Sequence, residues 1–526
     1  MQDPLRPETA DTIVALATPP GHGALGTVRF SGPRATHLAR QLFRPWKQED
    51  PFPAPRQAIS GTALGLPRRE DGIGQEENGI GKAEIRAQPG RGESGHGSSG
   101  RAALGPATDA AVPLDQGVLV FFPAADSPTG EDLVEITLHG SPMVLALFLD
   151  AAQARGARPA QPGEFSYRAF LNGRLDAAQA EAIGDLVRAR TAQQARVAHR
   201  QQTGALARAM EPARQELVDW LARLEGSIEF AATENEDFLD RSALATGLER
   251  IATTLGGLLQ QSARGLTLAR GVRVVLAGQV NAGKSSLFNA WLEQERAIVH
   301  HQPGTTRDLL EAEVDWDGLP VTLMDSAGER QALSASAGGE LDPVEQEGQR
   351  RGAAARHEAD LVIWLLDGAA DQPLWPPPAA AGEAPRLVAV SKGDLKPAPT
   401  VDPAHAEDLS PVRHGQATEG DLSPLPVFSA RSGSGLEELK HTALALLAPG
   451  WDRRERPLIT RLRQKGCLQR AVAALDEGRE LVAGGAGEEM IVLPLGQVLA
   501  ELARLTGRGD LEEVYDRIFS RFCIGK

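Results

Sequence analysis

Residues 278–285 read GQVNAGKS, a complete phosphate-binding loop of the form G-x-x-x-x-G-K-[ST]. The loop follows an apolar run at 272–277 that is typical of a buried strand. Its glycines let successive backbone N–H groups turn toward phosphates, Lys284 can reach the β/γ oxygens, and Ser285 can bind Mg²⁺. The sequence therefore predicts a strand–loop–helix unit that binds a nucleoside triphosphate.

Two motifs that contact the γ-phosphate in GTPases follow at the expected spacing. The first, GTTRD at 304–308, contains Thr306, whose hydroxyl can bind Mg²⁺ and whose N–H can reach the γ-phosphate. The second, DSAG at 325–328, follows a strand-like apolar run. We expect Asp325 in the second shell of the metal and the N–H of Gly328 near the γ-phosphate.

Two later motifs are suited to reading the base. SKGD at 391–394 supplies Asp394, which can accept two hydrogen bonds from guanine, whereas adenine has no such donor pair. SAR at 429–431 can place backbone N–H groups near the guanine carbonyl. The usual guanine motif begins with Asn, and the shorter Ser391 can bridge the loops less well, so we expect guanine specificity with weaker affinity. Each short motif alone fits an ordinary turn, but five in register predict a GTPase.

Periodicity divides the rest of the chain. Residues 1–171 alternate short apolar runs with Gly/Pro turns, which predicts a small α+β domain. Within it, 66–110 has almost no large apolar side chains and is expected to be a disordered insertion without catalytic role. Leucine stripes at helical spacing occupy 172–268 and 450–526, on either side of a G domain at 269–449. This order favours one helical domain with the G domain inserted; the alternative is two unrelated helical segments.

Composition excludes several classes of protein. No run of 18 apolar residues and no signal-peptide pattern is present, so we expect a cytoplasmic protein without a membrane span. Two cysteines are too few for a disulfide framework. The net charge of −15 argues against a broadly basic nucleic-acid surface. Any RNA contact must therefore use a local basic patch or be shared with a partner.

Outside the G domain the chain contains a further set of distinctive segments: DTIVA at 11–15, ATPPG at 17–21, TGED at 129–132, HG at 139–140, PGEF at 162–165, RAFLNGRLD at 168–176, QAEA at 179–182 and FCIGK at 522–526. With these segments the chain resembles the MnmE (TrmE) family of tRNA-modification GTPases along essentially the full length apart from the insertions. Other GTPases of the translation-factor class share the five nucleotide motifs but not these ends.

The resemblance implies a modification enzyme that works on tRNA. With a flavoprotein partner, MnmG (GidA), the family adds a carboxymethylaminomethyl-type group at C5 of the wobble uridine, and it forms a homodimer expected to join the partner as a heterotetramer. A tetrahydrofolate derivative, of the 5-formyl or methylene type, supplies the one-carbon unit. The folate-contacting positions correspond to Arg29, Glu135, Arg174 and Lys526. Arg174 stands where relatives can carry Lys, and each position could instead be a surface ion-pair residue.

The resemblance also implies that K⁺ replaces an arginine finger in GTP hydrolysis. The K⁺ ligands correspond to Asn281, His300, Gln302 and Thr305. The adjacent pair His300 and His301 is a poor zinc site without further partners. The full set of expected nucleotide contacts is Asn281, Ala282, Gly283, Lys284, Ser285, Ser286, His300, His301, Gln302, Pro303, Gly304, Thr305, Thr306, Asp325, Ser326, Ala327, Gly328, Ser391, Lys392, Asp394, Ser429, Ala430 and Arg431.

Hydrolysis also needs a group that positions the attacking water. The family uses a glutamate in a V-E-x-x-G pattern, which corresponds to Glu345 here, and we expect it to act with Lys284 and Thr306. Glu329, directly after Gly328 where relatives carry a hydrophobic residue, is a rival because a carboxylate there could reach the γ-phosphate in some conformations.

Two questions stay open at this point. Cys523 could add as a thiolate to the uridine ring, or could be a small packing residue beside its apolar neighbours. The alternative functions are a GTPase switch in ribosome or RNA assembly without modification chemistry, and a folate-binding scaffold whose G domain only signals.

Overall fold

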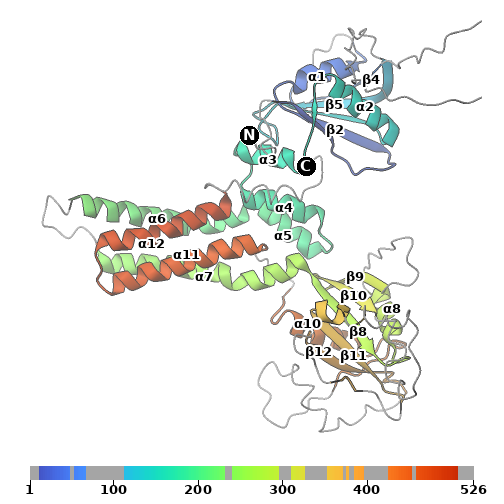
Figure 1. The fold of residues 1–526 in the computed structure, drawn as a ribbon, viewed down its shortest axis with the longest axis vertical. Helices are drawn as coiled ribbons and strands as arrows, with labels where there is room; N and C mark the ends of the chain where they lie inside the picture. Colours follow the sequence, from blue (N-terminus) through green and yellow to red (C-terminus); the bar gives the residue numbers. More distant parts are fainter. Residues whose placement is uncertain are drawn as a thin grey trace, which may run out of the picture. The chain divides into compact units, whose positions relative to one another are not determined.

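The computed structural model describes residues 11–47, 53–66, 112–230, 240–294, 310–325, 352, 354–370, 375–377, 384–395, 425–452 and 458–507. The chain divides into two compact units, Met1–Leu175 with Glu512–Lys526, and Asp176–Leu511. Figure 1 labels their helices and strands. Within the described ranges, no helix combines the length and the apolar character that a membrane span requires.

The first unit is built on a seven-stranded sheet in the order β3-β4-β5-β6-β2-β1-β7. Neighbouring strands are antiparallel except β1 and β7, which are parallel. Its elements are β1 (Ile13–Leu16), β2 (Leu25–Ser31), α1 (Ala35–Leu42), β3 (Phe43–Pro45), β4 (Ala58–Gly65), β5 (Val112–Phe122), β6 (Leu133–His139), α2 (Pro142–Ala154), β7 (Arg158–Pro159) and α3 (Glu164–Leu171). The stretch expected to be an insertion lies between β4 and β5, which pair with each other, and 67–111 is outside the described residues.

The two faces of this sheet carry different side chains, because successive residues on a strand point to opposite faces. Helices α1 and α2 pack on one face, where Phe30 of β2 and Phe148 of α2 meet edge to face with ring centroids 6.4 Å apart. On the other face, Ile13 of β1 is buried against Phe165 of α3. Arg29, between Val28 and Phe30 of the core, therefore projects toward the face that α1 and α2 do not cover.

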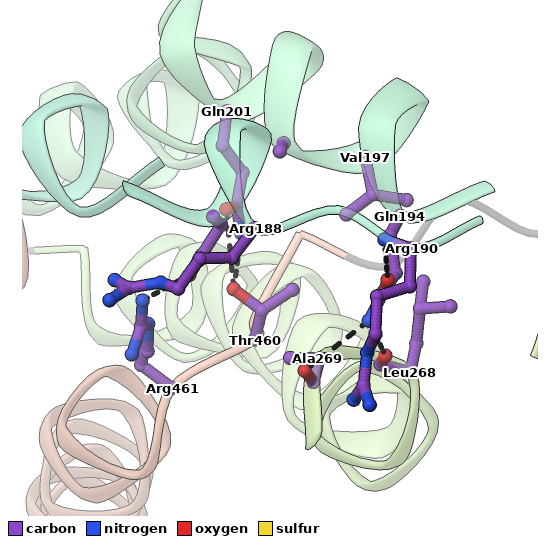
Figure 2. Close-up of a pocket in the computed structure, with 11 residues that line it drawn as sticks. Arg188, Arg190, Gln194, Val197, Gln201, Leu268, Ala269, Thr460 and Arg461 are labelled. Atoms are coloured by element: carbon purple, nitrogen blue, oxygen red, sulfur yellow. Dashed lines mark hydrogen bonds and ion pairs between the residues drawn. The ribbon is translucent and has the colours of Figure 1, made fainter. Parts of the chain in front are cut away.

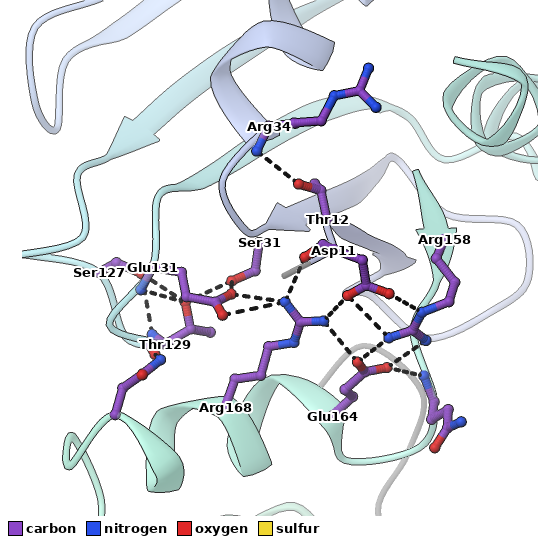
Figure 3. A network of polar contacts seen from close by, with 12 residues as sticks. Asp11, Thr12, Ser31, Arg34, Ser127, Thr129, Glu131, Arg158, Glu164 and Arg168 are labelled. Carbon is purple, nitrogen blue, oxygen red and sulfur yellow. Dashed lines mark hydrogen bonds and ion pairs between the residues drawn. The ribbon is translucent and has the colours of Figure 1, made fainter. Parts of the chain in front are cut away.

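A buried arginine joins α3 to the sheet (Figure 3). Arg168 has no exposed surface and donates to Glu131 at 3.1 Å, to Glu164 at 3.0 Å and to Asp11 at 2.5 Å. Arg158 donates to Asp11 and Glu164 as well. Partial burial alone would raise the pKa of Asp11, but the hydrogen bonds and charges of Arg158 and Arg168 hold that pKa below its usual value. The network fixes α3 against the segment that leads into β1.

The helical part of the second unit is one bundle. Helices α6, α7, α11 and α12 each pack against two others of the four, in the cyclic order α6, α7, α11, α12 (Figure 1). Its helices are α4 (Ala177–Val187), α5 (Ala192–Gln202), α6 (Ala205–Phe230), α7 (Arg241–Arg270), α11 (Leu462–Ala483) and α12 (Glu488–Thr506). Leucines of the segments before and after the G domain share a single core, for example Leu217, Leu248, Leu468 and Leu495. The inserted arrangement is therefore confirmed, and two unrelated helical segments are excluded.

The G domain is a five-stranded sheet in the order β12-β11-β8-β10-β9. All neighbours are parallel except β9, which pairs antiparallel with β10. Its elements are β8 (Val272–Gly278), α8 (Lys284–Gln294), β9 (Leu310–Trp316), β10 (Leu319–Asp325), β11 (Leu361–Asp367), β12 (Arg386–Ser391) and α10 (Leu436–Leu447). The carboxyl ends of β8, β10, β11 and β12 meet at one edge, which is where ligands bind in open α/β sheets.

Contacts at the end of α7 join the bundle to the G domain. Helix α7 continues to Arg270, past the expected border at residue 268, and ends at Gly271, which has φ of +74°. Arg190, before α5, donates to Glu313 of β9 at 2.7 Å and to the carbonyl of Arg270 at 3.0 Å. The hydroxyl of Thr191 donates to the carbonyl of Gly318 at 2.8 Å. The start of α5 is thus bonded to the β9–β10 hairpin.

Candidate nucleotide-binding site

The phosphate loop connects β8 directly to α8, as the sequence predicts. Gly278 and Gly283 have φ of +132° and +91°, in the region that favours glycine, and Asn281 has φ of +65°. The N–H of Ala282 donates to the carbonyl of Gln279 at 3.1 Å, which closes the turn. Helix α8 starts at the end of this loop, so its free N–H groups and positive dipole end face the expected phosphate position.

Lys284 is held inside the loop. Its ammonium donates to the carbonyls of Gly278 at 2.8 Å and Gln279 at 3.0 Å, and the residue is only 9% exposed. The loop thereby holds the ammonium at the carboxyl end of β8, beside the position where the motif predicts the β- and γ-phosphate oxygens.

Ser285 and Asp325 form the part of the site that fits Mg²⁺. The Ser285 hydroxyl donates to Oδ2 of Asp325 at 2.7 Å. Asp325, at the end of β10, is fully buried, and its Oδ1 has no hydrogen-bond partner among the described residues. A buried carboxylate oxygen without a donor is costly, whereas a hydrated divalent cation would satisfy it. The residues present therefore fit the metal that the sequence predicts.

The Ser391 side chain lies beside the phosphate loop but forms no hydrogen bond with it among the described residues. A Cβ added at Gly283 would stand 3.6 Å from the Cβ and 3.7 Å from the Oγ of Ser391. The hydroxyl instead donates to the carbonyl of Leu366 on β11 at 3.1 Å. This geometry gives a physical reason for the expected weaker bridging between the loops.

The base-reading motif contacts the SAR loop, although they are far apart in sequence. The N–H of Gly393 donates to the carbonyl of Phe428 at 3.0 Å, and Val390 bridges Val427. A hydrogen bond from Ser429, with a smaller contribution from the charge of Arg431, lowers the pKa of Asp394. Asp394 is therefore ionised at neutral pH, as acceptance of two hydrogen bonds from guanine requires.

Asp367 is a site residue that sequence reasoning missed. It ends β11 and accepts from Lys392 with Nζ 2.6 Å from Oδ2. Lys392 has φ of +58°, so this ion pair helps to hold a less common backbone conformation inside the SKGD motif. The available signal was a carboxylate at the end of an apolar strand, next to the strand that carries the motif.

The folate candidates of the first unit are partly described. Arg29 and Glu135 lie opposite each other on β2 and β6, and their side chains form an ion pair at 2.8 Å. The guanidinium of Arg29 also lies 5.6 Å from the ring centroid of Phe165. Arg174 donates to the carbonyls of Ala124 and Ala125 at 2.7 Å and 2.6 Å.

Several predicted residues lie outside the described part of the chain. They are His300, His301, Gln302, Pro303, Gly304, Thr305, Thr306, Ser326, Ala327, Gly328, Glu329, Glu345, Cys523 and Lys526. Their assignments stay predictions. Among the described residues, no cluster of His, Cys, Asp and Glu forms a metal site built from protein ligands alone.

Comparisons with known proteins agree with this architecture. A family model described as the MnmE helical domain matches residues 178–523, and one described as the GTP-binding protein TrmE N-terminus matches 81–174, which begins within the expected insertion. The tRNA modification GTPase MnmE of Koribacter versatilis is 34% identical and covers 98% of this chain and 99% of its own length. Those of Chloroflexus aurantiacus and Thermus thermophilus are both 35% identical, cover 98% of this chain, and match over 100% and 99% of their own lengths. The chain belongs to the MnmE family of tRNA modification GTPases.

Proposed function

We propose that this protein hydrolyses GTP and, with a flavoprotein partner of the MnmG (GidA) type, adds a carboxymethylaminomethyl-type group at C5 of the wobble uridine of certain tRNAs. The observation that carries this proposal is the assembled edge of the G-domain sheet, where Lys284, Ser285, Asp325 and Asp394 stand at their motif positions. Sequence similarity to tRNA modification GTPases over nearly the whole chain supports tRNA as the substrate. We infer a cytoplasmic homodimer that assembles with the partner.

The phosphate end of the site would bind and orient the nucleotide. Lys284 would exchange its two carbonyl acceptors for β- and γ-phosphate oxygens. Oδ2 of Asp325 would orient the Ser285 hydroxyl. Oδ1 of Asp325, which has no hydrogen-bond donor among the described residues, would face the hydrated cation. Ser285 would hold Mg²⁺, which would supply positive charge to stabilise the charge that develops in phosphoryl transfer. Thr306 would complete this side of the site.

The remaining barrier would be lowered by K⁺ and by a positioned water. Asn281 holds a left-handed conformation, which Asn adopts more readily than most residues and which supports a special role in the loop. We assign it to K⁺ together with His300, Gln302 and Thr305, and we assign the water to Glu345. Hydrolysis is expected to run faster in K⁺ than in Na⁺, and Asn281→Ala should remove most of that difference.

If Glu329→Ala lowers kcat more than Glu345→Ala, the assignment of Glu345 as the residue that positions the attacking water is wrong.

The one-carbon chemistry is assigned to the first unit. Arg29 and Glu135 occupy the sheet face that α1 and α2 leave uncovered, beside the ring of Phe165, which suits a flat heterocycle with polar edges. Arg174, Lys526 and Cys523 are the further candidates. The proposed ligand is a 5-formyl- or methylene-type tetrahydrofolate.

Nucleoside mass spectrometry of tRNA tests the proposed function. A strain that lacks the protein should contain unmodified wobble uridine in the affected tRNAs. Wild-type protein should restore the modification, and Asp325→Asn should not, because the phosphate end of the site would lose its carboxylate. A normal nucleoside profile in the deletion strain would favour a GTPase switch without modification chemistry.

A further inference from the structure

The helical part of the second unit contains an open cavity of about 380 Å³ that the nucleotide site does not use. Its polar lining comes from two places in the chain: Asp185, Arg188, Arg190, Gln194 and Gln201 in or near α4 and α5, and Thr460 with Arg461 before α11. Leu268 and Ala269 of α7 line it as well. We call this cavity, with its arginines, the basic pocket. Figure 2 shows Arg188 and Arg461 at one end of it and Arg190 at the other.

The two sequence segments that meet at the basic pocket are unusual in an acidic chain. The whole protein has a net charge of −15, yet 186–210 and 458–475 contain no Asp or Glu. Their basic residues are Arg188, Arg190, Arg196, His199, Arg200, Arg208, Arg461, Arg463, Lys465 and Arg470. Gln201 ties the segments together by donating to the hydroxyl of Thr460 at 3.1 Å. Folding therefore concentrates positive charge that the linear sequence keeps apart.

The carboxylates in and around the basic pocket do not cancel this charge. Glu313 is bonded to Arg190, and Glu181 to Arg463 at 3.0 Å. Glu501 is bonded to Arg470 and to Arg504. Asp185, the acidic residue of the lining, serves two arginines, with a hydrogen bond from Arg461 and an electrostatic contact with Arg188. The pocket keeps an excess of positive charge.

The geometry of the arginines suits a phosphate group. The Nε of Arg461 is buried and has no hydrogen-bond acceptor among the described residues. Arg188 is exposed at the rim, and Lys465 lies one helical turn beyond Arg461 on the same side of α11. No described residue forms an ion pair with Lys465. A guanidinium binds phosphate oxygens through paired N–H groups, and Lys465 extends the charge beyond the cavity, as a chain of phosphates would need.

We propose that the basic pocket, continued by Lys465, holds the sugar–phosphate backbone of the tRNA substrate. The inference rests on the proposed function. Because the chain as a whole is acidic, contact with an RNA backbone needs a local group of basic residues, and the basic pocket supplies one. It places the RNA at the end of α7, next to the bonds between Arg190 and the β9–β10 hairpin of the G domain. The contact positions tRNA without reading its bases.

The test compares two double variants of the full-length protein. Arg188→Gln with Lys465→Gln removes two charges from the pocket. Arg250→Gln with Arg479→Gln removes two charges from other parts of α7 and α11, where both arginines form surface ion pairs. Binding of an unmodified tRNA transcript is measured by fluorescence anisotropy at several salt concentrations. GTP hydrolysis without tRNA and thermal unfolding should match the wild type in both variants.

The pocket variant should bind tRNA at least about tenfold more weakly, and its slope of log K against log [salt] should fall by roughly 1 to 2, while the control variant changes little. Equal losses in the two variants would mean that net charge alone matters and would overturn the proposal. So would unchanged tRNA binding in a pocket variant that no longer binds the flavoprotein. If the wild type modifies tRNA but the pocket variant binds tRNA normally, this inference fails while the proposed function stands. If the wild type neither binds nor modifies tRNA, the proposed function fails.

Discussion

We expect recognition of guanine to depend on one ionised side chain. Ser429 donates to Asp394 and lowers its pKa, so the carboxylate is a pure acceptor at neutral pH. Asp394→Asn should weaken GTP binding and favour xanthine nucleotides, because an amide can donate to the carbonyl that xanthine has in place of the guanine amine. Competition between GTP and XTP measures the change. An unchanged preference for GTP would show that residues 391–394 do not read the base.

We expect the residue at the start of the same motif to set the affinity rather than the choice of base. The Ser391 hydroxyl is bonded to Leu366 and not to the phosphate loop, although its Cβ lies beside Gly283. Ser391→Asn would bring an amide within reach of that loop, and one added hydrogen bond worth about 1 kcal/mol should tighten GDP binding about fivefold. Calorimetry of GDP binding checks this, with Ser391→Ala as the control. Affinity that stays equal or falls in a stably folded Asn variant would contradict the role.

At the scale of elements, α3 depends on the charge network around Arg168. Replacing this fully buried residue by Met leaves the carboxylates of Glu131, Glu164 and Asp11 without their shared partner. Arg168→Met should destabilise the first unit by about 3–5 kcal/mol. The matched control is Arg56→Met, whose ion pair with Asp126 is exposed and should contribute about 0–1 kcal/mol. Hydrogen exchange of peptides from β1 and α3 distinguishes the two, and similar exchange in both variants would show that the network adds no stability.

The same network predicts how stability depends on pH. The pKa of Asp11 is lowered in the folded unit. Its stabilising effect is therefore present above the unfolded-state pKa, about 3.9, and is lost as the pH falls through the lower folded-state value. Asp11→Asn should destabilise the first unit near neutral pH, and the difference from wild type should shrink below about pH 4. Urea unfolding at several pH values, followed by backbone exchange in β1, measures this difference; a constant gap across that range would refute the linkage.

Sequence patterns were most informative for elements with a strong period or a motif. Leucine spacing predicted the helices on both sides of the G domain, and the apolar runs predicted β8, β10 and β12 at the motif positions. The ion pair between Asp367 and Lys392 and the network around Arg168 were not predicted. Their partners come from separate elements, so no local period reveals them, and only the tertiary packing of strands and helices brings them together.

For the whole molecule, β4 and β5 show how an insertion is accommodated. Gly65 and Val112 are paired neighbours at the ends of these strands, so the residues between them leave and return at one place. Deleting 70–106 should leave folding and GTP hydrolysis nearly unchanged, because the residues that remain can span adjacent strands. Hydrolysis rate and thermal unfolding are the measurements. Loss of dimerisation or of folate binding would show that the stretch, part of which matches the family model, belongs to the domain.

The two ends of the G domain lie at the same hairpin. Gly271, which opens the domain, lies against Pro320 at the start of β10, and Trp451, near its close, donates from its indole to the carbonyl of Asp317 at 3.1 Å. Because the two ends of the G domain lie close together, the domain can be gained or lost as a unit without disrupting the helical bundle into which it is inserted.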